Sequence, residues 1–167
     1  AALACCAAVF PTTAAAQTKT LLRISTPAVP DDWHGKMWTV FKETLDKSAP
    51  GEFDVQINLN ATLFKQGTEP AAMARGNLEL SSISAFDIAK QVPEFSIFTA
   101  GYVIRDPQHQ AKVFGGPIGQ EMFKLASDRM EVTLLTPIYL GTRQVNLREV
   151  KPVRTPADLK GVKLRMP

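Results

Sequence analysis

The sequence has 167 residues, enough for one ordinary domain or for one domain and the beginning of a second. Hydrophobic residues make up 45% of it and charged residues 21%, a balance that favours a folded core and excludes general disorder. The formal net charge is only +3, and the lysines and arginines are spread singly without basic-aromatic alternation. A nucleic-acid-binding surface therefore has little support.

The first 16 residues have the composition of a targeting signal. They are apolar, small and uncharged, and Ala14–Ala16 precede a polar stretch that begins at Gln17. This pattern resembles the hydrophobic region and A-x-A cleavage site of a secretory signal peptide, so we expect cleavage after Ala16. Cys5 leaves a lipoprotein signal open. Because no initiator Met or basic start precedes the apolar run, we expect a truncated copy of a longer sequence.

Two segments near the start of the mature chain alternate in hydropathy as strands do. Leu22–Ser25 is the first, and the prolines at positions 27 and 30 end it. Phe53–Leu59 is the second, with apolar residues at every other position. We expect both to be strands with one buried face.

A helix is expected between these strands. Asp31 or Asp32 can cap it, and apolar residues then recur at every fourth position from Trp33 to Leu45. This spacing predicts that Trp33 lies in the core and leaves Trp38 as a surface residue that could form an aromatic wall.

The remaining elements continue the alternation of helices and strands, which argues for an α/β layer structure. They are, in chain order, a short helix from Thr68 to Met73, a strand over Leu78–Ile83, a helix from Asp106 to a break at Gly115–Pro117, a helix from Ile118 to Leu125, and strands over Val132–Leu140 and Val162–Met166.

Residues for catalysis or metal binding are not grouped in the sequence. His34 and His109 are the only histidines, and neither lies in a recognisable nucleophile motif. No cluster of Cys, His and carboxylate residues has the spacing of metal ligands. We therefore expect a protein that is not an enzyme and that needs no cofactor or metal.

Hydroxyl groups at the end of the third predicted strand are candidates for ligand binding. Ser81–Ser84 could donate hydrogen bonds to a ligand in the crevice outside the strand ends, although strand-end serines more often bond nearby backbone groups. Thr26, directly after the first strand, is a second candidate position.

Two arginines near the end of the chain differ in the face of the predicted strand on which they lie. Arg143 is in phase with Val145 and Leu147, so on strand geometry it faces the apolar side, where a guanidinium needs an anionic or multi-acceptor partner. Structural and ligand-binding roles are equally open for it. Arg165 shares the polar face of its predicted strand with Lys163, and spacing alone favours a solvated position.

Several stretches occur in an order and spacing typical of one family. They are Gly76–Leu80, Val92–Phe95, Leu140–Gln144, Pro152–Gly161 and Val162–Pro167. Together they resemble the solute-binding proteins of tripartite ATP-independent periplasmic (TRAP) transporters, the DctP-like family. The resemblance covers the mature chain from about position 21.

The resemblance implies a periplasmic-binding-protein-like fold of two α/β lobes that close around a ligand. Residues 19–140 would form the first lobe and residues 141–167 the start of the second, after the partial signal peptide at 1–16. It implies a periplasmic protein that captures a small organic acid and delivers it to TRAP-type membrane subunits. No nucleic acid and no stable membrane insertion of the mature chain are expected.

The resemblance also assigns roles to residues. The arginine at the position of Arg165 holds the ligand carboxylate in this family, and the one matching Arg143 often assists. We add Ser84 and Thr26 as ligand-binding candidates. Ser84 stands where sialic-acid binders carry a Glu, which disfavours that specificity.

Two other functions remain open at this point. The same lobes serve binding proteins of ATP-driven or sensor-linked systems. A secreted hydrolase would need a nucleophile and base that these residues lack.

Overall fold

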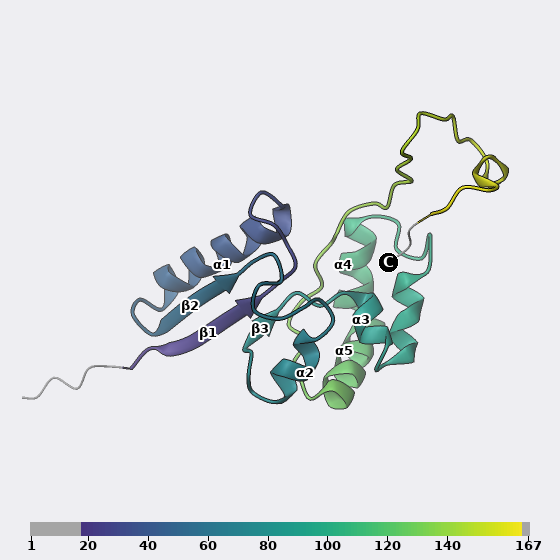
Figure 1. Cartoon of the computed structure of the whole chain (residues 1–167). Coiled ribbons are helices and arrows are strands. Elements are labelled where there is room, and N and C mark those ends of the chain that lie inside the picture. The colour runs from purple at the N-terminus through teal and green to yellow at the C-terminus, as the bar shows by residue number, and fades with distance from the viewer. Residues whose placement is uncertain (1–17, 165–167) are drawn as a thin grey trace, which may run out of the picture.

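The computed structural model describes residues 18–164. The predicted signal peptide and Arg165 lie outside these residues. The described chain is built on a sheet of three parallel strands in the order β2-β1-β3, which are β1 (Thr20–Ser25), β2 (Phe53–Asn58) and β3 (Leu80–Ser81). The first two confirm the predicted strands, whereas the third is shorter than predicted (Figure 1).

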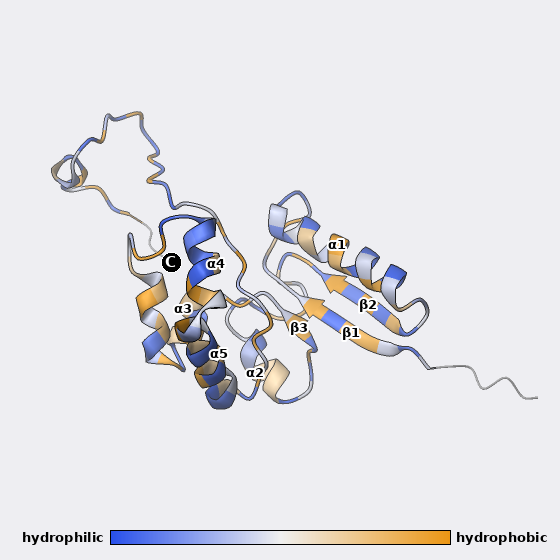
Figure 2. Cartoon of the chain, turned by 180° about the vertical axis from the view of Figure 1, so that it is seen from behind, coloured by the Kyte–Doolittle hydropathy of each residue, from blue (hydrophilic) through white to orange (hydrophobic). Residues whose placement is uncertain are grey.

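Helix α1 (Trp33–Ser48) connects β1 to β2 and covers one face of their sheet (Figure 1). As expected, an Asp caps it: Asp32 accepts a hydrogen bond from the backbone N–H of His34 at 3.2 Å. Ile24 and Val55 are buried beneath the helix, and the alternating colours of β1 and β2 in Figure 2 reflect this one-sided burial.

The two tryptophans of α1 are placed opposite to expectation. The side chain of Trp38 lies in the core at 7% exposure, whereas Trp33 is 76% exposed. Steps of four residues drift around a helix by about 40° each, so a strict four-residue pattern leaves the buried face. Trp38, Phe41 and Leu45 follow the mixed three- and four-residue spacing that stays on it.

Four helices and a 3-10 segment follow β2. They are α2 (Glu69–Ala74), α3 (Ala85–Ala89), the 3-10 helix η1 (Pro93–Thr99), α4 (Pro107–Gly115) and α5 (Pro117–Met130). The predicted start of α4 is confirmed, because Asp106 accepts a hydrogen bond from the backbone N–H of His109 at 2.6 Å. The predicted break between α4 and α5 is also confirmed.

A second core joins α3, η1 and α5 beside the sheet. Its buried residues are Ile88, Val92, Phe95, Ala126, Met130 and Val132. A run of aromatic contacts extends it toward α4, since the ring of Phe98 lies 5.3 Å from Phe95 and 4.7 Å from Phe114 between centroids. These helices form the group at the right of Figure 1, away from α1.

Residues 131–155 form neither a helix nor a strand, so the strand predicted over Val132–Leu140 is wrong. Val132 and Leu134 still pack against the second core, and the N–H of Leu134 donates to the Ser127 hydroxyl at 3.2 Å. Among residues 18–164 no strand pairs with this segment, and a strand requires such a pairing partner. Beyond it, the described chain has the short 3-10 helix η2 (Pro156–Leu159), in the yellow part of Figure 1.

The strand predicted at Val162–Met166 is not observed in the part of it that the structure describes. Residues 162–164 are irregular, and the rest lies outside the described residues. Within residues 18–164, every helix falls short of the length and apolar character that crossing a membrane demands.

Candidate functional site

The strand order creates a switch in chain direction at the carboxyl edge of the sheet. From β1 the chain passes to β2 on one side, and from β2 it crosses back to β3 on the other side of β1. The loops after β1 and β3 therefore start side by side, with Ser25 and Ser81 opposite one another in the register. In open α/β sheets such a switch point is where ligands bind.

Hydrogen bonds fix the strand ends and the loops at this edge to one another. The hydroxyl of Ser81 donates to the carbonyl of Ser25 at 2.7 Å, and the hydroxyl of Ser25 accepts from the backbone N–H of Phe64 at 3.3 Å. The edge thus brings together two of the positions singled out in the sequence, Thr26 and the serine run that ends at Ser84.

Thr26 is 1% exposed and its polar groups are bonded within the protein. Its hydroxyl accepts from the N–H of Ala28 at 3.3 Å, its N–H donates to the carbonyl of Asn58 at 3.1 Å, and its carbonyl accepts from the N–H of Ala61 at 2.9 Å. These bonds tie the loop after β1 to the loop after β2. Direct ligand binding by Thr26 stays a prediction, and it would require part of this network to open.

Ser84 caps α3. Its hydroxyl accepts from the backbone N–H of Asp87 at 3.2 Å and donates to the carboxylate of Asp87 at 2.7 Å. Lys90 pairs with the other oxygen of that carboxylate at 2.7 Å. Burial opposes ionisation of Asp87, but the hydrogen bonds from Lys90 and Ser84 outweigh it and hold the pKa of Asp87 below its usual value. Ligand binding by Ser84 also stays a prediction.

Ser82 belongs to the serine run proposed from the sequence as a source of ligand-binding hydroxyls, but it was not distinguished there from its neighbours. Its hydroxyl oxygen accepts a hydrogen bond from the indole Nε1 of Trp38 at 3.0 Å. The sequence could not distinguish it within the serine run, because the last residue of β3 is set by pairing with β1 rather than by local pattern. A correct prediction that Trp38 is buried could have pointed to Ser82, because a buried indole N–H needs an acceptor nearby.

Arg143 is not brought to this edge of the sheet. Arg143 is exposed in the irregular segment and, among the described residues, has no hydrogen-bond or ion-pair partner. The expectation that it faces an apolar side is therefore not met here. Arg165 lies outside the described residues, so its position at a ligand site stays a prediction.

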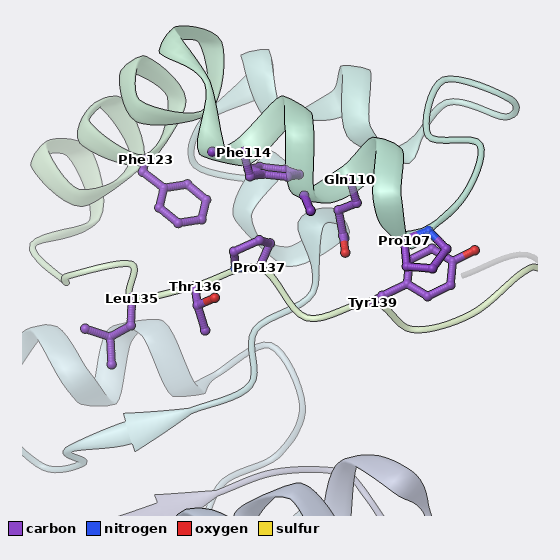
Figure 3. A pocket seen from close by; sticks show the side chains of 10 residues that line it. Pro107, Gln110, Phe114, Phe123, Leu135, Thr136, Pro137 and Tyr139 are labelled. Carbon is purple, nitrogen blue, oxygen red and sulfur yellow. The ribbon is translucent and has the colours of Figure 1, made fainter.

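Two hollows elsewhere on the surface have different linings. One of about 570 Å³ lies between α4, α5 and residues 135–139 and is lined by aromatic rings and uncharged polar groups, including Phe114, Phe123, Gln110 and Tyr139 (Figure 3). The other, of about 390 Å³, is mainly apolar at η1, α4 and α5. Neither is lined by a residue from the loops that follow the strands, and neither offers a Lys or Arg to an anionic ligand.

The structure is similar to solved TRAP periplasmic solute-binding proteins. One from Roseobacter denitrificans, with bound 3-deoxy-D-manno-oct-2-ulosonic acid (KDO), is 42% identical with a TM-score of 0.82, covering 90% of this chain and 49% of that chain. Another from Sulfurospirillum deleyianum, with bound succinate, is 24% identical with a TM-score of 0.62, covering 66% of this chain and 36% of the other, and shows the fold alone. The α/β fold of this class is thus confirmed.

Curated relatives show the same family relationship. A solute-binding protein of Verminephrobacter eiseniae is 33% identical over 153 residues, which are 92% of this chain and 44% of that protein. The C4-dicarboxylate-binding periplasmic protein DctP of Rhodobacter capsulatus is 24% identical over 87% of this chain and 43% of its own length. The chain spans about half the length of the curated relatives it matches. The family model described as "Bacterial extracellular solute-binding protein, family 7" (DctP) matches residues 24–167, and the chain belongs to this family.

Proposed function

We propose that the full-length protein captures a small organic acid in the periplasm and delivers it to a TRAP-type secondary transporter. The observation that carries this proposal is the similarity, at 42% identity over 90% of the chain, to a TRAP solute-binding protein that holds KDO. Membership of family 7 supports it over the whole span from residue 24 to residue 167. The names of the similar solved proteins favour TRAP delivery over an ATP-driven or sensor-linked system.

The proposed ligand class is that of small carboxylates, with sugar acids foremost. Similar structures hold KDO, succinate and galactonate, which share a carboxylate and differ in size and hydroxyl content. A guanidinium can bind a carboxylate through two parallel hydrogen bonds. Arg165 is proposed as that partner, with Arg143 assisting.

The proposed mechanism is capture by closure of two lobes. Residues 19–140 would form the first lobe, which offers the carboxyl edge of its sheet, and the chain from residue 141 onward would begin the second. A hinge motion then encloses the ligand and excludes water, and no covalent bond is made or broken. Enclosure strengthens the guanidinium–carboxylate attraction, because the surroundings become less polar.

The test measures the binding of a panel of acids to the full-length protein, first by thermal shift and then by calorimetric titration. KDO, galactonate and succinate are compared, and the methyl ester of the tightest binder serves as a matched control without the charge. A bound acid at 100 times its Kd stabilises the folded state by about 2.7 kcal/mol, which gives a readily measured rise in Tm. The proposal is wrong if no acid raises the Tm, or if the ester binds as tightly as the acid.

A further inference from the structure

Five hydroxyl groups surround the switch point between β1 and β3, and four of them have structural roles. Within the described residues, the hydroxyls of Ser25 and Thr26 act only as acceptors, of backbone N–H groups, but both residues are fully buried, which closes these hydroxyls off from a ligand in the present structure. Ser81 donates to the carbonyl of Ser25, and Ser84 donates to Asp87. The fifth is Ser82, which is half-buried.

The hydrogen bond that Ser82 makes uses only its acceptor capacity. An indole N–H can only donate, so the bond of 3.0 Å from Trp38 occupies a lone pair of the Ser82 oxygen. The hydroxyl hydrogen of Ser82 must then point away from the indole, and within residues 18–164 the Ser82 hydroxyl donates no hydrogen bond. Ser82 therefore presents an unused donor at the edge of the sheet.

The position of that donor is fixed by a rigid support. Trp38 is 7% exposed and its ring meets Phe41 edge-on, with 5.6 Å between centroids. The indole belongs to the core that joins α1 to the sheet, so its N–H cannot turn without disturbing that packing. A donor held this way loses little conformational freedom when a ligand binds.

Resting on the proposed function, we infer that the Ser82 hydroxyl donates a hydrogen bond to an oxygen of the bound organic acid and that Trp38 is the positioning residue that aims it. The site lies at the switch point, where the loops after β1 and β3 diverge. Thr26 and Ser84 lie at the same edge and shape it through their internal bonds.

The first test compares Ser82→Ala with Ser81→Ala in the full-length protein by calorimetric titration with KDO, or with succinate if KDO does not bind. Each substitution removes one hydroxyl from neighbouring positions. Ser82→Ala should weaken binding by at least about tenfold, the lower end of what one hydrogen bond to a charged acceptor contributes. Ser81→Ala should lower the Tm but leave the Kd within about twofold, since its hydroxyl bonds the protein backbone.

The second test asks whether Trp38 acts through Ser82. Trp38→Phe keeps an aromatic ring and removes the N–H, so it should weaken binding about threefold to tenfold when Ser82 is present. In the Ser82→Ala background it should change the Kd by less than about twofold, because the group it orients is gone. A merely structural loss would weaken both backgrounds equally.

The outcomes separate this inference from the proposed function. A parent protein that binds none of the acids overturns the proposed function and the inference with it. A parent that binds, with Ser82→Ala within twofold of its Kd, overturns the inference alone. If Trp38→Phe fails to fold, the comparison of Ser82→Ala with Ser81→Ala still decides.

Discussion

The two indoles of α1 experience different surroundings on neighbouring turns of one helix. Trp38 packs on Phe41 beneath the helix at 7% exposure, whereas Trp33, in the first turn, is 76% exposed. Trp38→Ala should lower the free energy of unfolding by about 3–5 kcal/mol, because it leaves a cavity in the core. Trp33→Ala, the matched control, should change it by less than about 0.5 kcal/mol. Urea unfolding of both variants checks this, and equal losses would contradict the burial assigned to Trp38.

The carboxyl group of Glu69 is buried without a full set of hydrogen-bond partners in the described structure. The residue is 3% exposed, and within residues 18–164 its Oε1 has no hydrogen-bond partner. Burial raises the pKa of Glu69, and the charge of Asp87 raises it further, although nearby backbone amides oppose the shift. The ionised form is thus disfavoured in the folded state.

The sign of the pH effect follows from proton binding. Between the ordinary pKa of a Glu, about 4.3, and the raised value, the folded protein holds more protons at Glu69 than the unfolded chain does. The contribution of Glu69 to stability is therefore greatest below that ordinary pKa and falls as the pH rises through the raised one.

Glu69→Gln should remove this loss. As the pH is raised from about 4 to about 8, the free energy of unfolding of the variant should increase relative to that of the parent, because an amide does not ionise in this range. Urea unfolding across this pH range is the measurement, with Glu121→Gln on the exposed side of α5 as a control for the substitution itself. A difference between variant and parent that does not change with pH would show that Glu69 is not the source.

At the scale of elements, the close approach of α4 and α5 depends on a residue without a side chain. A Cβ on Gly119 would lie 2.2 Å from the Cα of Phe114 and 2.4 Å from its carbonyl oxygen. Backbone atoms cannot move aside cheaply, so the two helices could not keep their present spacing around a larger residue.

Gly119→Ala should therefore lower the free energy of unfolding by about 1–3 kcal/mol or more. Gly115→Ala is the matched control, since a Cβ there meets nothing within 4 Å. Its stability should be unchanged or higher by less than about 1 kcal/mol, because Ala restricts the unfolded chain. Thermal unfolding of the two variants tests the pair, and an undisturbed Gly119→Ala protein would refute the contact.

At the scale of the whole molecule, the carboxylate site that we propose would depend on chain segments that meet only after both of the proposed lobes form. Arg165 is proposed to pair with the ligand carboxylate once the lobes close. Truncating one member of a buried charge pair costs roughly 2–5 kcal/mol, so Arg165→Ala should weaken binding about 30-fold to several-thousand-fold. Arg165→Lys should also bind poorly, because an ammonium cannot reproduce the two-pronged contact.

Lys163→Ala is the control for Arg165, because Lys163 is exposed and is not among the proposed ligand-binding residues. Its Kd should stay close to that of the parent. Calorimetric titration of the full-length variants with the tightest acid of the panel is the measurement. If the Kd of Arg165→Ala lies within threefold of that of the parent, Arg165 does not hold the ligand carboxylate.

The sequence by itself determined the elements whose signals are local. Asp32 and Asp106 each cap a helix by bonding an N–H two or three residues on, and the Gly115–Pro117 break lies between neighbouring helices. β1 and β2 were predictable because each has one buried face and alternates accordingly. The spacing of the family stretches also indicated the family before any fold was known.

Only the tertiary structure decided the features that depend on distant partners. Strand pairing joins residues far apart in the chain, so β3 is two residues long and Val132–Leu140 forms no strand despite its apolar run. The choice between Trp33 and Trp38 depended on which side of α1 packs against the sheet. The bond from Trp38 to Ser82 spans 44 positions, and no periodicity within either segment records it. Local patterns report which residues prefer burial, whereas packing decides which of them find a partner.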